Sequence, residues 1–197
     1  MKKVLLIYVV LIAGIIIWYY GVGQGKKVFG DSKVNALKVG KHSPEFNQSM
    51  EEIMGSYYEM TDSFIKDDTA AINQNAAKLR ISLDSLKIGE LKKDSDIYET
   101  AATIWDDAKT EINGMISDPS LQAKRESLNL FSDQLYTLLN AVHYDLAKLY
   151  WMQCSSAFGE DTPGGWLTKS EKSQNPYGKE NCGEVKKIIN PADSSKK

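Results

Sequence analysis

The sequence predicts an all-α protein: an up-and-down four-helix bundle, preceded by one transmembrane helix and completed by an irregular C-terminal loop between two cysteines. Apolar residues recur at three- and four-residue steps through four consecutive segments. An uncharged run lies near the N-terminus, and the only two cysteines, Cys154 and Cys182, enclose a segment rich in turn residues. The chain has 197 residues, 42% of them hydrophobic and 25% charged. We therefore expect one globular domain with appendages.

The N-terminal run Val4–Tyr20 carries no charge and follows Lys2 and Lys3. At about 1.5 Å per helical residue it is just long enough to cross a bilayer. We predict that residues 1–20 form a transmembrane signal anchor. The alternative is a signal peptide that is cleaved near Gly21-Val22-Gly23.

The basic residues around this run disagree about its orientation. Lys2 and Lys3 favour an N-terminus on the inside, whereas five lysines follow the run: Lys26, Lys27, Lys33, Lys38 and Lys41. We choose the N-inside orientation, because long domains are translocated largely regardless of charge. The expected protein is thus a single-pass protein of the bacterial inner (cytoplasmic) membrane, with its C-terminal domain in the oxidising periplasm.

The soluble part divides into three regions. Residues 21–43 are rich in Gly, Lys, Ser and Asn and are predicted to be a linker. Residues 44–190 form the predicted helical bundle domain with its C-terminal loop, and residues 191–197 a disordered tail. Ser43-Pro44-Glu45 predicts the start of the first helix, with a cap, a proline at the first position and an acid near the positive end of the helix dipole.

Three further helices follow at short intervals. Asp67-Asp68-Thr69 predicts a break and a second cap, Asp94-Ser95 the start of the third helix, and Asp118-Pro119 that of the fourth. Helices joined by short turns pack as antiparallel neighbours. The apolar stripes are formed by Phe46, Met50, Ile53, Met54, Tyr57, Thr61 and Phe64, by Ile72, Ala76, Leu79, Leu83 and Leu86, by Ile97, Ala101, Ile104, Ala108, Ile112 and Met115, and by Leu128, Phe131, Leu135, Leu138 and Val142.

The pattern changes after Val142. Ala147–Cys154 either extends the fourth helix or forms an extended segment, and Pro163-Gly164-Gly165 ends regular structure. Asn175-Pro176-Tyr177-Gly178 predicts a turn, and Glu184–Ile189 a short helix or strand. The residues expected to anchor this loop are Trp166, Asn175, Pro176 and Tyr177.

Several functional classes are excluded by what the sequence lacks. The net charge of -2 and the dispersal of lysines among acids give no basis for nucleic-acid binding. Neither His42 nor His143 follows a glutamate at the spacing of a carboxylate-bridged metal site in a bundle. The motifs of covalent haem, phosphate-binding loops and nucleophile elbows are also missing. We therefore predict that the protein is not an enzyme.

The cysteine pair has three interpretations. A disulfide between Cys154 and Cys182 would close a loop of about 28 residues and contribute roughly 3–4 kcal/mol. A soft-metal site for Cu(I) or Zn would use both thiolates, with Met152 as a third ligand if the segment is extended. A redox sensor would need an exposed cysteine beside a cation, and no basic residue adjoins Cys154. On the residues alone the disulfide is favoured, because the spacing is not that of a close-set ligand motif.

The order of motifs in the last third of the chain is more specific. Leu149-Tyr150 leads to Cys154, and Gly164–Thr168, Asn175-Pro176-Tyr177 and Cys182–Val185 follow. This order resembles a bacterial domain of unknown function that occurs alone in envelope proteins and is also appended to the periplasmic adaptors of copper and silver efflux pumps. The resemblance covers about residues 45–190.

The resemblance implies a soft-metal site, because in that family Pro-Met follows the first cysteine and another methionine precedes the second. Here Cys154 is followed by Ser155-Ser156, and residues 178–181 contain no methionine. The cysteine pair is kept and both of these thioethers are lost. With the resemblance taken into account, the metal site and the disulfide are equally favoured interpretations of the cysteine pair.

We expect a non-enzymatic, membrane-anchored envelope accessory domain that binds or handles a soft heavy metal such as copper. Cys154 and Cys182 would be the ligands and Met152 a third. The alternative is a disulfide-stapled interaction module of a membrane complex, without metal. The expected partners are the membrane, through the N-terminal helix, and an envelope or efflux-type protein.

Overall fold

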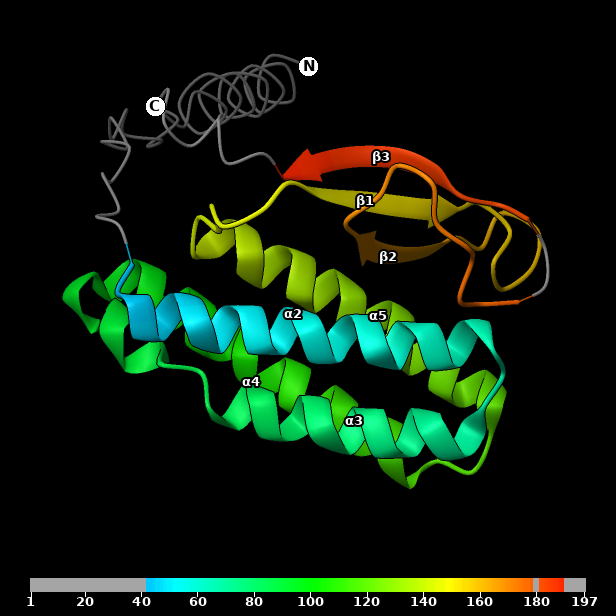
Figure 1. Cartoon of the computed structure of the whole chain (residues 1–197), viewed down its shortest axis with the longest axis horizontal. Helices are drawn as coiled ribbons and strands as arrows, with labels where there is room; N and C mark the ends of the chain where they lie inside the picture. Colours follow the sequence, from blue (N-terminus) through cyan, green and yellow to red (C-terminus); the bar gives the residue numbers. More distant parts are fainter. Residues whose placement is uncertain (1–41, 179–180, 190–197) are drawn as a thin grey trace, which may run out of the picture. The chain divides into compact units, whose positions relative to one another are not determined.

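Four helices form a bundle, and a three-stranded antiparallel sheet packs on it next to the first and the last of these helices (Figure 1). The computed structural model describes residues 42–178 and 181–189. The helices are α2 (Pro44–Ile65), α3 (Thr69–Asp84), α4 (Ser95–Ser117) and α5 (Leu121–Ala141). A 3-10 helix, η1 (Ile88–Lys93), joins α3 to α4. Successive helices run in alternating directions, as the sequence predicts.

Side chains cap the helix starts. Ser43 Oγ accepts a hydrogen bond from the nitrogen of Phe46 at 3.1 Å, with Pro44 in the first turn. Asp68 and Asp94 cap α3 and α4 in the same way. For α5 the cap is Ser120 rather than the predicted Asp118, which instead ends α4. Each cap satisfies a backbone donor that the helix itself leaves free.

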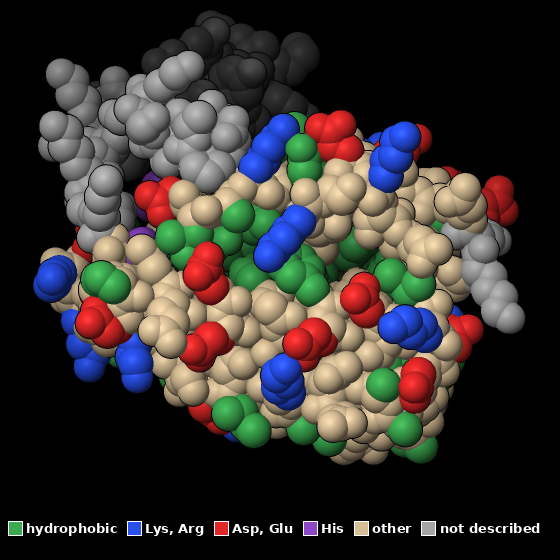
Figure 2. Space-filling view, in the orientation of Figure 1, with side chains coloured by type: hydrophobic (Ala, Val, Ile, Leu, Met, Phe, Trp, Pro, Cys, Tyr) green, Lys and Arg blue, Asp and Glu red, His purple; other side chains and the backbone are tan. Residues whose placement is uncertain are grey.

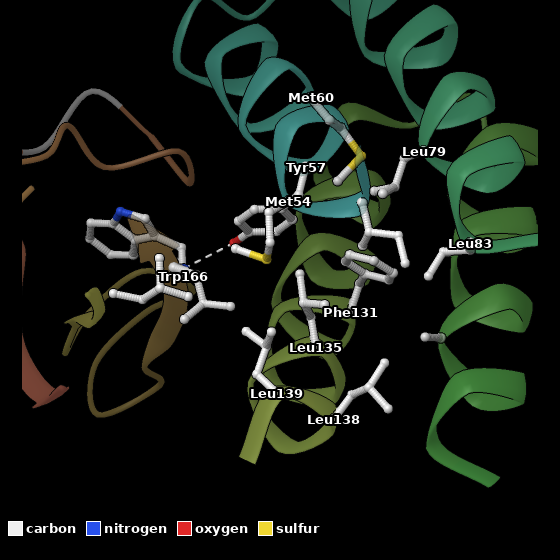
Figure 3. Close-up of a cluster of buried hydrophobic side chains, with 14 of the residues drawn as sticks. Met54, Tyr57, Met60, Leu79, Leu83, Phe131, Leu135, Leu138, Leu139 and Trp166 are labelled. Carbon is white, nitrogen blue, oxygen red and sulfur yellow. Dashed lines mark hydrogen bonds between the residues drawn. The ribbon is translucent and has the colours of Figure 1, made fainter. Parts of the chain in front are cut away.

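The core lies between the helices and is filled by the predicted stripes. Met54, Tyr57 and Met60 of α2 meet Leu79 and Leu83 of α3 and the apolar side of α5 (Figure 3). All of these side chains are buried. Burial of each contributes on the order of 1.5–3 kcal/mol.

The sheet consists of β1 (Leu149–Cys154), β2 (Gly164–Thr168) and β3 (Glu184–Ile189), in the order β2-β1-β3. The prediction of an all-α fold is therefore wrong. The sequence left Ala147–Cys154 open between helix and extended segment, and its last six residues form the central strand. β1 is buried on both faces because the helices cover one face and the loop after β2 covers part of the other, so it lacks the alternation that marks a half-exposed strand.

Among the residues described, no helix has the length and apolar character needed to cross a membrane. The predicted span, residues 1–20, lies outside them, as do residues 21–41 of the predicted linker and the predicted tail 191–197. The predictions of a transmembrane protein and of a single-pass inner-membrane location with a periplasmic domain are withdrawn on this finding.

Candidate functional site

The two cysteines form a disulfide at the end of the sheet where β1 finishes and β3 begins. Cys154 is the last residue of β1, and Cys182 lies just before β3 with its Cα 5.2 Å from that of Cys154. Cys154 is buried and Cys182 partly buried. Asn175 donates a hydrogen bond from Nδ2 to Sγ of Cys182 at 3.2 Å. The bond thus holds the start of β3 beside the end of β1.

The loop between β2 and β3 folds over the outer face of the sheet. The indole of Trp166 is fully buried and donates to Ser173 Oγ at 3.2 Å. Its ring meets that of Tyr177 edge-on, with centroids 6.0 Å apart. Asn175 Oδ1 accepts from the nitrogen of Tyr177 at 3.0 Å, and Pro176 between them is buried. The four predicted anchor residues therefore lie together in a small second core.

This arrangement does not suit a soft metal. Cys154 and Cys182 are bonded to each other, so neither offers the thiolate that Cu(I) or Zn requires. Met152 lies on the same face of β1 as Cys154 but is buried among packed side chains. No cluster of three or more potential His, Cys, Asp or Glu ligands occurs within the part of the chain that the structure describes. Of the two roles predicted for this cysteine pair, the structure has the disulfide, which leaves Cys154 and Cys182 without a free thiolate to act with Met152.

One edge of the sheet is covered by the helices. The backbone nitrogens of Gly165 and Leu167 in β2 point away from β1. That of Gly165 donates to Asn129 Oδ1 of α5 at 2.8 Å. That of Leu167 donates to the hydroxyl of Tyr57 of α2 at 3.0 Å (Figure 3). The outward donors of β2 are therefore satisfied within the molecule, and this edge is not open to another strand.

The Tyr57 hydroxyl is the centre of a buried polar network. It accepts from the nitrogen of Leu167 and lies 2.8 Å from Ser132 Oγ, in a hydrogen bond for which either hydroxyl can be the donor. Tyr177 donates to the carbonyl of Gly165. Burial raises the pKa of Tyr57, partly offset by its hydrogen bonds to Ser132 and Leu167. Burial also raises the pKa of Tyr177, so both phenols stay protonated at neutral pH.

Among the residues that the structure describes, no strand pairs with the opposite edge of the sheet, β3. Five of its six residues are exposed, among them Val185 at 37% and Ile188 at 49%. Lys187 lies opposite Trp151 and Val185 opposite Met152, so Lys186 is an extra residue that forms a bulge. The bulge places Val185 and Ile188 on the same face of the sheet. Sequence reasoning left Glu184–Ile189 undecided between helix and strand and did not identify this surface.

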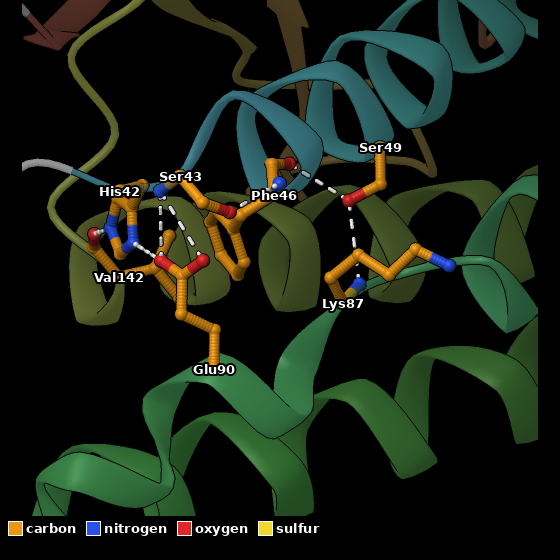
Figure 4. A network of polar contacts seen from close by, with 7 residues as sticks. All are labelled: His42, Ser43, Phe46, Ser49, Lys87, Glu90 and Val142. Carbon is orange, nitrogen blue, oxygen red and sulfur yellow. Dashed lines mark hydrogen bonds and ion pairs between the residues drawn. The ribbon is translucent and has the colours of Figure 1, made fainter.

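Two further polar arrangements were not predicted. His42 Nδ1 lies 3.1 Å from Glu90 Oε1 and its Nε2 lies 2.6 Å from the carbonyl of Val142, so the ring joins η1 to the end of α5 (Figure 4). Lys124 is fully buried, and its Nζ donates to the carbonyl of Met115 at the end of α4. Burial lowers the pKa of Lys124, against the opposing effect of Asp118. Both are structural contacts at helix ends.

A polar hollow of about 710 Å³ lies where α2 ends, beside the loop that carries Asn175. Its lining includes Lys66 and Asp67, and Asp67 forms an ion pair with Arg125 at 2.5 Å. The hollow lacks a pair of convergent groups suited to acid–base chemistry among the residues described.

Part of the helical region is similar to a known protein family. Residues 53–145 match the family model described as "Protein of unknown function (DUF3347)". The match runs from within α2 to just beyond α5 and ends before β1, so the sheet and both cysteines lie outside it. Neither the curated proteins nor the solved structures gave a significant match. The expected similarity to a domain of unknown function is thus supported for the helices.

Proposed function

We propose that this chain, whose helices match a family of unknown function, is a non-catalytic protein-binding module that presents the open edge of its disulfide-closed sheet to a partner. The observation that supports this proposal is the contrast between the two sheet edges. Tyr57 and Asn129 saturate the outer edge of β2, whereas β3 is solvent-exposed along almost its whole length. An unpaired strand edge is a common site for main-chain recognition.

The rest of the fold suits a scaffold for that edge. The helical bundle holds β2, β2 holds β1, and Cys154–Cys182 holds the start of β3. A recognition strand fixed before binding loses less conformational entropy when the partner arrives. Apolar side chains are also gathered between α2 and the strands, with acidic and basic side chains around them (Figure 2). The surface is therefore mixed in charge and suits a protein partner.

The expected role in handling copper or a similar metal is replaced by this proposal, because the thiolates it needs are joined in the disulfide. The cysteine-bracketed segment resembles domains appended to metal-efflux adaptors, and we use this resemblance to propose the class of partner rather than a bound metal. We propose a protein subunit of such an assembly as the partner class, and no nucleic acid.

Site-specific photo-cross-linking of the full chain in its source cells tests the function. A photoreactive amino acid replaces Ile188 in one variant and Ile81 in another; Ile81 is an isoleucine of α3 with 68% of its surface exposed. We expect an adduct of discrete mass from position 188 and none from position 81. Equal adducts at both positions, or none at either, would contradict the proposal.

A further inference from the structure

We propose that β3 binds an extended segment of its partner that alternates acidic and apolar residues and pairs with the strand as a fourth member of the sheet. This inference rests on the proposed function and specifies the chemistry of the partner. It follows from the charges of β3, from the position of its apolar residues and from what pairing with a second copy would require.

The apolar contribution comes from Val185 and Ile188. Val185 lies opposite Met152 and Ile188 lies opposite Tyr150. The bulge at Lys186 therefore brings both side chains to the face of the sheet that carries Met152 and Tyr150. An added strand places alternate side chains on that same face, next to Val185 and Ile188. Apolar residues at those positions would cover surface that is now exposed to solvent.

The charge of the strand selects for acids. Lys186 forms an ion pair with Glu184 at 2.7 Å, which leaves the exposed Lys187 without a carboxylate partner among the described residues. Lys187 Nζ instead lies 5.2 Å from the ring centroid of Tyr136. Opposite charges in facing positions of neighbouring strands stabilise the pair by roughly 0.2–1 kcal/mol each. A glutamate or aspartate of the partner opposite Lys187 is therefore favoured. A second acidic residue of the partner can pair with Lys186, which already pairs with Glu184.

A second copy of this chain fits the same edge less well. Two β3 strands related by a two-fold axis run antiparallel, and the register that pairs Val185 with Ile188 also sets Lys186 opposite Lys187, twice. Like charges in facing positions destabilise a strand pair. In a homodimer, the register that pairs the apolar side chains therefore brings like charges together. An acidic partner strand can satisfy both the apolar side chains and the lysines.

The test uses the full chain and two fluorescent peptides of ~6 residues, the length of a typical strand. One alternates glutamate with valine, and the other alternates lysine with valine. We expect the acidic peptide to bind roughly tenfold more tightly than the basic one, as two facing charge pairs imply. The double variant Lys186→Glu/Lys187→Glu should reverse the preference. The matched control Lys92→Glu/Lys93→Glu, at two exposed lysines of η1, should leave it unchanged.

Two further measurements separate main-chain pairing from charge attraction and from self-association. N-methylation of alternate peptide nitrogens removes strand donors and should abolish binding of the acidic peptide. Equal binding of both peptides, or binding that survives N-methylation, would overturn the proposal. A concentration-dependent dimer that Ile188→Lys abolishes and Ile81→Lys does not would assign the edge to a second copy instead. In the free monomer, slow exchange of those Val185–Ile188 amides that point away from β1 would show that another segment of this chain already covers the edge.

The outcomes also distinguish this inference from the function on which it rests. A position-188 adduct without a preference for the acidic peptide would leave the binding module intact and refute the partner chemistry. The absence of both results would refute both.

Discussion

The hydroxyl of Tyr57 in α2 accepts a hydrogen bond from the backbone nitrogen of Leu167 in β2 at 3.0 Å, across 110 positions of the chain. Both residues are buried, and the same hydroxyl bonds Ser132 of α5. One phenol oxygen therefore connects two helices to the edge of the sheet. A buried contact of this kind determines where the strand lies, because a donor that loses its partner in the interior is costly to leave unpaired.

Substitution Tyr57→Phe should lower the free energy of unfolding by about 1–3 kcal/mol, because it leaves the Leu167 donor and Ser132 without their partner while keeping the ring. The adjacent Tyr58 is a matched control. Its hydroxyl is buried and has no hydrogen-bond partner among the residues described, so Tyr58→Phe should cost little or stabilise the protein. Urea denaturation of the two variants measures the difference. Equal losses would show that the Leu167 contact has no special weight.

The disulfide predicts a specific loss of stability. Cys154→Ser/Cys182→Ser should lower the free energy of unfolding by about 3–4 kcal/mol, since the unfolded chain regains the freedom of a loop whose ends are 28 positions apart. Reductant should bring the wild type to the stability of the double variant and leave the variant unaffected. A free-thiol count on the denatured, unreduced protein should give none. Two titratable thiols in that assay would reopen the metal interpretation.

Glu90 predicts a pH effect at the acid end. Burial acts to raise its pKa, but hydrogen bonds from the side chain and backbone of Ser43 and from His42 outweigh burial and lower the pKa below its ordinary value. The folded state therefore binds this proton less readily than the unfolded state. The stabilisation is complete above the unfolded pKa of about 4.3 and is lost as the pH falls through the lower, folded value.

Glu90→Gln should accordingly destabilise the protein at neutral pH and make little difference at the lowest pH at which the protein remains folded. Thermal denaturation as a function of pH records this convergence. Glu126→Gln, at an exposed glutamate of α5, serves as the control and should run parallel to the wild type. Parallel curves for Glu90→Gln as well would show that the network in Figure 4 does not depend on the charge.

Gly165 and Gly55 predict opposite effects of alanine. A Cβ at position 165 would overlap the indole of Trp151, so Gly165→Ala should destabilise by about 1–3 kcal/mol. Gly55 lies inside α2, where an added Cβ would meet nothing within 4 Å, and Gly55→Ala should stabilise by about 0.5–1 kcal/mol. Differential scanning calorimetry of both variants checks the two signs. A stable Gly165→Ala protein would mean that Trp151 packs loosely enough to move aside.

The sequence predicted the helices well because their signals are local. Ser43, Asp68 and Asp94 lie where helices begin, and the apolar period identifies the faces that pack. The strands had no such signal. β1 is apolar on both faces, β2 begins with two glycines that are typical of a loop, and β3 is exposed and therefore has no buried face to mark it. These three strands are distinguished from loops only by their pairing with one another, which joins segments that are distant in the sequence.

The same limit applies to the candidate site. Cys154 and Cys182 were recognisable as a pair, but whether they bind each other or a metal depends on how β1 and β3 approach. Tyr57 and Tyr58 are neighbours of identical chemistry, and only the position of β2 decides which hydroxyl finds a partner. The open edge of β3 likewise follows from the order of the strands, which no local pattern encodes.

The bond between Cys154 and Cys182 also turns the intervening chain into a covalent ring that contains β2. A protease that cuts once inside this ring, for instance at the exposed stretch Glu160–Pro163, leaves the two fragments joined through sulfur. The nicked molecule keeps its full mass until a reductant separates the pieces. Such a cut spares β3, which stays attached to β1 at the cross-link and along the strand pairing, so the surface offered to a partner outlasts the loss of chain continuity.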